Sequence, residues 1–164
     1  MANKRVRTLL LTGLLMVGLI GGAVPASATN IGNEGCTPGF WANNTGQWAE
    51  TAYSPTMTLG SVFNLALYPD LADDTFLDAL SPSYSRGGDA EKLLRAAVAA
   101  FLNADHEGVG YPLRRFSDPG NILAAVNSAL ASQDSTTILD LKDTLDDANN
   151  LGCPLSADEA RNNR

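Results

Sequence analysis

The sequence CTPGFWANN at residues 36–44 is followed closely by Trp48. It holds one of the two cysteines and, together with Trp48, both tryptophans. The second cysteine, Cys153, lies almost at the other end of the chain, within the sequence NNLGCP at residues 149–154. A bond between the two cysteines would close a loop of 118 residues. We therefore expect the two ends of the folded region to meet at the tryptophan-containing segment.

The beginning of the chain has the pattern of a secretory signal peptide. Three basic residues lie within the first seven positions, a nearly uninterrupted apolar run covers 9–24, and small residues occupy 26–28. An uncleaved N-terminal anchor is the alternative, but the cleavage motif argues against it. We therefore expect residues 1–28 to be removed, the mature protein to be secreted and extracellular, and no membrane association to remain.

The charge of the mature chain limits the classes of partner. Removal of the leader leaves 136 residues, enough for one domain, with 8 basic against 18 acidic side chains and a formal net charge of −10. This excess disfavours nucleic acids and anionic membranes, because both would repel the protein at long range. It fits an extracellular protein that is kept soluble by its charge or that meets cations.

The two cysteines are interpreted as one disulfide, Cys36–Cys153, because an exported chain meets an oxidising environment. A metal-ligand or catalytic thiol role is the alternative, but two distant cysteines do not make a ligand set. The bond would clamp ends that otherwise fray. The predicted organisation is a flexible leader at 29–35, a disulfide-closed helical domain at 36–155 and a polar C-terminal tail at 156–164.

Apolar residues recur at helical spacing along most of the chain and predict an all-α bundle of five or six helices. The strongest prediction is a helix at 89–104, capped by Asp89; it is apolar nearly all round and so belongs in the middle of the bundle. Two shorter helices are expected before it: one at 58–67 capped by Thr58, and one carrying Phe76 to Leu80 and capped by Asp73 or Asp74. After it, a helix is expected to start at Pro119, following a cap at Ser117 or Asp118. A last helix carries Ile138 to Ala148 and is ended by Gly152.

The candidate binding residues surround the two tryptophans. Aromatic rings there could stack on sugar rings or on the side chains of a partner, because tryptophan offers a large apolar face and one hydrogen-bond donor. The alternative, which the neighbouring cysteine favours, is a small aromatic core that holds the disulfide against the bundle. The candidates are Phe40, Trp41, Asn43, Trp48 and Tyr53.

Motifs for catalysis are missing from the sequence: we find no nucleophile elbow, no histidine pair at helical spacing and no phosphate-binding glycine loop. The single histidine, His106, lies in a glycine-flanked polar loop, where we expect it to be solvated; a metal site with its two acidic neighbours is the alternative.

Glu50, beside the aromatic segment, is the carboxylate whose neighbourhood suggests glycoside hydrolysis, but nothing marks its partner. Four aspartates within 70–78 lack the spacing of a calcium loop and are interpreted as charges at a helix start. We predict no catalytic residue, metal or cofactor.

Several motifs, in order, resemble a secreted bacterial module whose hallmark is Cys-Thr-Pro-Gly-Tyr/Phe-Trp-Lys-Asn-His and which closes with Asn-Asn-x-Gly-Cys-Pro. The resemblance covers residues 35–155. The segments that carry it are GCTPGFW at 35–41 with Trp48, LLRAAVAA at 93–100 with NA at 103–104, YP at 111–112, VNSAL at 126–130 and NNLGCPL at 149–155. No biochemical function is established for this family, so the resemblance implies an architecture and leaves the activity open.

The chain departs from the hallmark where Ala42 and Asn44 replace the lysine and the histidine, while Asn43 is kept. If those two side chains carried an activity of the family, this member should lack it. The leading hypothesis is a secreted, non-catalytic binding or structural module of the extracellular or cell-wall space, with an extracellular glycan or another exported protein as its partner. The alternatives are a small carboxylate-dependent hydrolase of wall polysaccharide and calcium-dependent adhesion.

Overall fold

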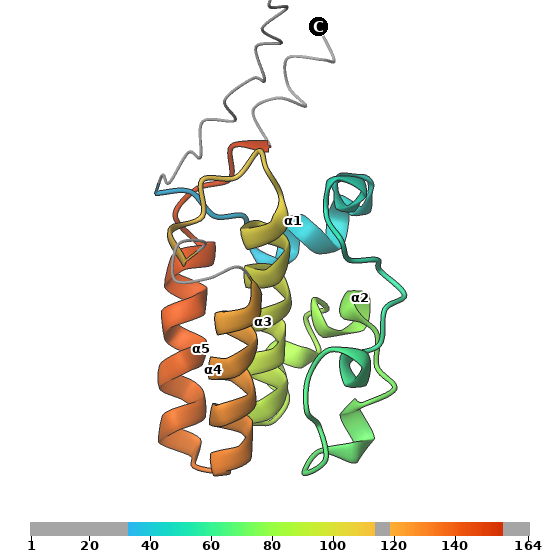
Figure 1. The fold of residues 1–164 in the computed structure, drawn as a ribbon, viewed down its shortest axis with the longest axis vertical. Coiled ribbons are helices and arrows are strands. Elements are labelled where there is room, and N and C mark those ends of the chain that lie inside the picture. Colours follow the sequence, from blue (N-terminus) through green and yellow to red (C-terminus); the bar gives the residue numbers. More distant parts are fainter. Residues whose placement is uncertain (1–32, 114–118, 156–164) are drawn as a thin grey trace, which may run out of the picture.

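The computed structural model of the protein describes residues 33–113 and 119–155 (Figure 1). The predicted signal peptide at 1–28 and the polar tail at 156–164 lie outside the described residues. Within the described part the fold is all-α, and the Cys36–Cys153 disulfide joins its two ends, as predicted. In that part, every helix is too short or too polar to cross a membrane.

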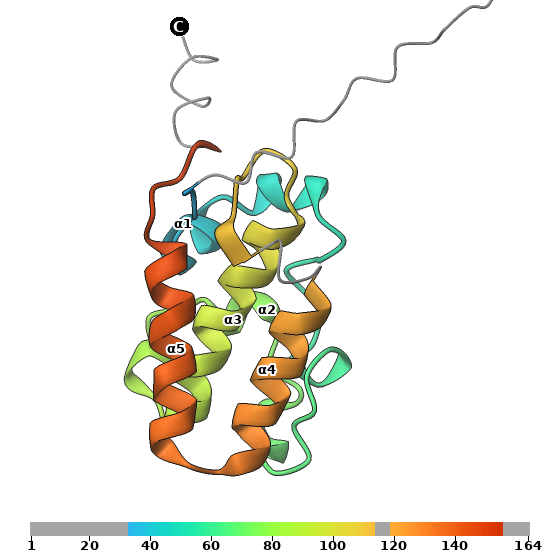
Figure 2. The ribbon, with the colours of Figure 1, turned by 60° about the vertical axis from the view of Figure 1, so that its left-hand side comes forward.

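Three long helices form the body of the bundle: α3, Asp89–Asp105; α4, Pro119–Ser132; and α5, Ser135–Asn149. They run side by side in both views (Figures 1 and 2). The central helix is α3, which contacts α4, α5, and the short helices α1, Pro38–Asn43, and α2, Phe76–Ala79. The prediction of a central helix at this position is thus confirmed.

The central position of α3 follows from its composition. A run of small residues at 96–100 is buried on all sides, so neighbouring helices can approach its backbone from several directions. Its N-cap is Gly88 rather than the predicted Asp89, and the Glu91 carboxylate accepts a hydrogen bond from the Gly88 backbone N–H. The acidic first turn complements the positive end of the helix dipole.

The ends of α4 and α5 are set by local signals. Pro119 is the first residue of α4, as predicted, while the predicted caps Ser117 and Asp118 lie outside the described residues. Asp134 caps α5, because its carboxylate accepts a hydrogen bond from the Thr137 backbone N–H at 2.8 Å. The turn between the two helices passes through Gln133, a non-glycine residue at φ 53°.

The predicted helix at 58–67 is wrong. Only a 3₁₀ turn, Leu59–Ser61, forms after Thr58, and that residue makes no side-chain capping bond. The backbone N–H of Leu59 donates instead to the carbonyl of Asp74 at 2.8 Å, fifteen residues later in the chain. Because the first N–H groups of this segment donate to carbonyls across a loop, no α-helix starts after Thr58.

The cap of α2 also differs from the prediction. Thr75, and not Asp73 or Asp74, caps this helix: its hydroxyl accepts from the Asp78 N–H at 3.1 Å, and its own N–H donates to the Asp78 carboxylate at 3.0 Å. This reciprocal pair is a capping box. The hydrogen bonds from Thr75 hold the pKa of Asp78 below its usual value.

The two ends of the domain close on one another beside the disulfide. The Gly35 backbone N–H donates to the Gly152 carbonyl at 3.0 Å, and Gly152 has φ +113°, a conformation that favours glycine. The Glu34 carboxylate accepts from the Gly110 N–H at 2.7 Å. The predicted boundary of the flexible leader, 29–35, therefore needs correction, because residues 34–35 are part of the folded domain.

Candidate functional site

Both tryptophans lie in the core of the domain. Trp41 is 0% exposed and Trp48 is 2% exposed, and they belong to the same buried cluster as Cys36. The Trp48 indole N–H donates to the Trp41 carbonyl at 3.1 Å, which ties the two residues together. Neither ring offers a face to a ligand in this structure. The two rings instead form part of the aromatic core beside the disulfide.

The other candidate binding residues do not share one surface. Phe40 is half-buried and packs edge-on against Trp41, with ring centroids 5.4 Å apart. Asn43 is exposed, but its side-chain amide donates to a carbonyl of its own helix, that of Gly39, at 2.7 Å. Tyr53 lies in another aromatic group and stacks on Phe76 at 5.5 Å. The structure therefore separates the predicted aromatic site into two packing clusters.

Asn103 is a buried polar residue at the centre of a hydrogen-bond network, which we call the hub. The sequence analysis did not predict this role. Its side-chain oxygen accepts from the Cys36 N–H at 2.8 Å and from the Trp41 indole N–H at 3.2 Å. Its amide group donates to the Cys36 carbonyl at 2.8 Å and to the Asn149 side chain at 2.9 Å. One fully buried amide thus connects α3, α5 and the disulfide segment.

Asn149 extends this network to the end of α5. Its side-chain oxygen also accepts from the Tyr111 hydroxyl at 2.9 Å, and its amide donates to the Ala96 carbonyl at 2.9 Å. Because each of these polar groups is buried and has a partner, the network fixes one arrangement of the helices. The motif residues at this end of the bundle therefore have a structural explanation.

The expectation of a solvated His106 is wrong. Its side chain is 1% exposed, because the loop after α3 folds back and the Trp41 ring lies 5.8 Å from the imidazole. Its Nδ1 accepts from the Gly108 N–H at 3.0 Å, and its Nε2 lies 3.5 Å from the carboxylate of Glu50, which is mostly exposed. The structure therefore places His106 beside Glu50, the carboxylate whose neighbourhood in the sequence suggested glycoside hydrolysis.

Tyr53 carries a pH-dependent contribution to stability. Burial, with a smaller effect from the negative charge of Asp105, raises the pKa of its hydroxyl to about 12. An unfolded tyrosine ionises near pH 10, so above that pH the unfolded chain releases a proton that the folded protein retains. We expect urea-unfolding experiments to show stability falling between about pH 10 and pH 12. The fall should be smaller in Tyr53→Phe; an unchanged pH profile would contradict this assignment.

Helices α3 and α5 begin at the end of the bundle that lies away from α1 and the disulfide (Figure 1). A cavity of about 480 Å³ is lined by residues at their beginnings. Its volume is within the range of small-molecule sites. Three segments that are distant in sequence contribute to its wall. The lining residues are Leu67, Tyr68, Pro69, Asp70, Leu71, Gly88, Asp89, Ala90, Glu91, Gln133, Ser135 and Ile138. We call it the α3–α5 end cavity.

Apolar and polar side chains meet in the end cavity. Tyr68 is half-buried, and its hydroxyl donates to the Leu130 carbonyl at 3.3 Å, which positions the ring. The Asp89 carboxylate is occupied by its neighbour Ser135, which donates at 2.6 Å. By contrast, the side chains of Asp70 and Gln133 are exposed and make no hydrogen bond or ion pair with the described residues. They are the polar groups of the cavity that a ligand could engage.

Two of the four aspartates at 70–78 have structural partners. Asp74 accepts a hydrogen bond from the Tyr84 hydroxyl, and Asp78 forms the capping box described above. In the ranges that the structure describes, no group of three or more histidine, cysteine, aspartate or glutamate side chains is arranged to hold a metal ion.

Comparisons with known proteins do not add a relative: no protein-family model, no curated protein and no solved structure matches this chain. The resemblance to the secreted bacterial module stays a prediction that rests on its motifs. Any function must therefore be argued from the cavity and the side chains that line it.

Proposed function

We propose that this protein is a secreted, non-catalytic binding module that holds a sugar unit of an extracellular glycan in the α3–α5 end cavity. The observation that supports this function is the combination of a fixed tyrosine ring with the unengaged polar groups of Asp70 and Gln133 on one cavity wall. The Cys36–Cys153 disulfide is consistent with an extracellular location.

The chemistry of the cavity fits a neutral, polyhydroxylated ligand. An aromatic ring offers an apolar surface, while carboxylate and amide groups accept and donate hydrogen bonds to hydroxyl groups. No lysine or arginine is among the residues that line the cavity, and Asp70, Asp89 and Glu91 are acidic. A ligand with a large negative charge is therefore disfavoured at this position.

The backbone at Gln133 gives the proposal a second support. A left-handed conformation at φ 53° is unfavourable for a residue with a side chain, and glycine is the usual residue where a helix ends in this way. Glutamine at this position keeps an amide at the edge of the cavity. A residue that costs stability and lines a cavity is typical of a binding function.

The variant Gln133→Gly separates the effect of Gln133 on stability from its effect on ligand binding. We expect its free energy of unfolding to be unchanged or raised by up to about 1 kcal/mol, because glycine relieves the left-handed backbone. Asp70→Ala should leave the fold intact and reduce affinity about tenfold or more, the effect of losing a charged hydrogen-bond acceptor. The measurement is co-sedimentation with insoluble wall polysaccharides, followed by titration calorimetry with fragments released from the polymer that binds.

Asp73→Ala is the matched control, because Asp73 is exposed in the same segment and does not line the cavity. It should bind as the unchanged protein does. Failure of the unchanged protein to bind any polysaccharide, or binding that survives both Asp70→Ala and Gln133→Gly, would disprove the proposal.

A hydrolase that uses Glu50 is the alternative function. The carboxylate of Glu50 lies beside the buried His106, a pairing that can hold or move a proton. Glu50 does not line the end cavity. If the protein cleaves a wall polysaccharide and Glu50→Gln abolishes that turnover, the hydrolase is correct; binding without any turnover supports the module.

A further inference from the structure

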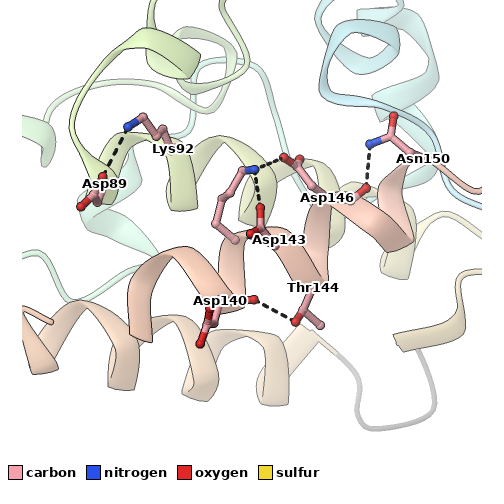
Figure 3. A network of polar contacts seen from close by, with 8 residues as sticks. Asp89, Lys92, Asp140, Asp143, Thr144, Asp146 and Asn150 are labelled. Atoms are coloured by element: carbon pink, nitrogen blue, oxygen red, sulfur yellow. Dashed lines mark hydrogen bonds and ion pairs between the residues drawn. The ribbon is translucent and has the colours of Figure 1, made fainter. Parts of the chain in front are cut away.

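Most of the basic side chains in the described ranges lie close together. The lysine and arginine residues of the described ranges are Arg86, Lys92, Arg95 and Lys142. Three of the four line one cavity of about 180 Å³, together with Ser85 and Asp146. This cation-lined cavity lies between α3 and α5, and Figure 3 shows this region with Lys92 on α3 and Asp143 and Asp146 on α5.

Both lysines of the cavity have acidic partners. The Lys92 ammonium lies 3.3 Å from the Asp89 carboxylate, one turn earlier on α3. The Lys142 ammonium lies 2.7 Å from Asp143 and 3.0 Å from Asp146, both on α5 (Figure 3). An ammonium carries three donors, so Lys142 keeps one N–H beyond its two carboxylate contacts.

Arg95 differs from the two lysines because it has no such partner. It is the one charged residue in the apolar run at 93–104, and its side chain is half-buried. Its Nε is fully buried and has no hydrogen-bond partner among the described residues, with which Arg95 also forms no ion pair. Burial lowers the pKa of this guanidinium, and the negative charge of Asp146 partly opposes that effect. A half-buried cation without an acceptor requires an explanation.

We propose that Arg95, flanked by Lys92 and Lys142, binds an oxyanion group, a carboxylate or a phosphate ester, carried by a larger ligand. The planar guanidinium presents parallel donors that match the oxygens of either group, and such charge-assisted pairs are among the strong hydrogen bonds of proteins. The cavity volume suits one such group and not a whole sugar chain. This inference does not depend on the end cavity or its ligand.

The acidic character of the chain does not forbid this site. At physiological ionic strength, charges further away than about 8 Å are largely screened, so the nearest groups decide whether an anion is accepted. Nearby, two of the three cations are neutralised by carboxylates and Arg95 is not. The bound oxyanion would give the Arg95 guanidinium an acceptor that the described residues do not supply to its Nε.

The test compares the unchanged protein with Arg95→Met by titration calorimetry and thermal unfolding in inorganic phosphate, acetate and chloride at equal ionic strength. We expect phosphate, acetate or both to bind the unchanged protein and raise its melting temperature, and Arg95→Met to lose at least tenfold in affinity. Without added anion, Arg95→Met should melt at the same temperature or higher, because it removes an unpaired, half-buried charge. Preference for phosphate or acetate distinguishes the two sources of oxyanion.

Arg86→Met is the matched control, because Arg86 is a described arginine that does not line the cavity. It should retain the response to anions. Arg95→Lys provides a second variant that keeps the charge but loses the paired donors, and it should bind more weakly than arginine. Absence of binding to the unchanged protein, or equal melting shifts in the unchanged protein and Arg95→Met, would overturn the proposal, because anions also stabilise proteins by exclusion from their surface.

Discussion

Asn103→Leu is expected to lower the free energy of unfolding by at least about 3 kcal/mol, although leucine and asparagine are similar in size. The substitution leaves three buried polar groups without a partner, the N–H and C=O of Cys36 and the indole N–H of Trp41. The Asn149 oxygen loses one bond and keeps the one from Tyr111. Each group loses a hydrogen bond in a place that water does not reach, which costs about 1–3 kcal/mol per group. Urea unfolding followed by tryptophan fluorescence measures the effect.

Two further variants make this prediction specific to hydrogen bonding. Asn103→Asp has the same shape and keeps the acceptor, but it cannot donate to the Cys36 carbonyl or to Asn149, so we expect a loss at least as large. Asn43→Ala removes an exposed asparagine that bonds only within its own helix and should cost less than about 1 kcal/mol. An Asn103→Leu variant as stable as Asn43→Ala would show that the hub is unimportant.

Loss of the disulfide is the second large effect that we expect. The Cys36→Ala/Cys153→Ala variant should be less stable by about 4 kcal/mol, because the bond removes the conformational freedom of a loop of 118 residues from the unfolded chain. The reduced unchanged protein is the control for packing, since it keeps both sulfur atoms. Its unfolding midpoint in urea should lie close to that of the double variant.

The disulfide and the hub should also be coupled. Cys36 exchanges two backbone hydrogen bonds with Asn103, so a frayed Cys36 segment would lose both contacts. A double-mutant cycle that combines Asn103→Leu with removal of both cysteines should therefore give a loss smaller than the sum of the separate losses. Strict additivity would contradict this coupling, and a reduced protein as stable as the oxidised one would contradict the clamp itself.

Local patterns in the sequence were enough to predict the main architecture. The apolar circumference of the helix at 89–104, the proline that starts α4 and the glycine that follows α5 each act within a few residues. The Cys36–Cys153 pairing was also predictable, because only two cysteines exist. The segment at 58–67 was mispredicted because the N–H groups of Leu59 and Gly60 donate to carbonyls at 72–74, which helical propensity cannot anticipate.

The candidate sites depend on tertiary contacts and were mostly hidden. Tyr68 and Gln133 are 65 positions apart in the chain and meet only at the end cavity. His106 has polar and glycine neighbours typical of a solvated loop, but the Trp41 ring covers it. Arg95 was visible as part of a motif, yet only the structure shows that its Nε lacks a partner. The sequence alone does not show whether a buried hydrogen-bond donor has a partner.

The closure of the two ends has a consequence for the order of events during synthesis. The ribosome releases Cys36 and Trp41 early, but their partners Asn103 and Cys153 emerge much later, and the last of them only near the end of translation. We expect no stable subdomain from the first half alone, because the Cys36 N–H and the Trp41 indole N–H find their acceptor in Asn103. We therefore expect the chain to fold as a single cooperative unit only when it is almost complete, and the oxidation of its two thiols to follow that folding.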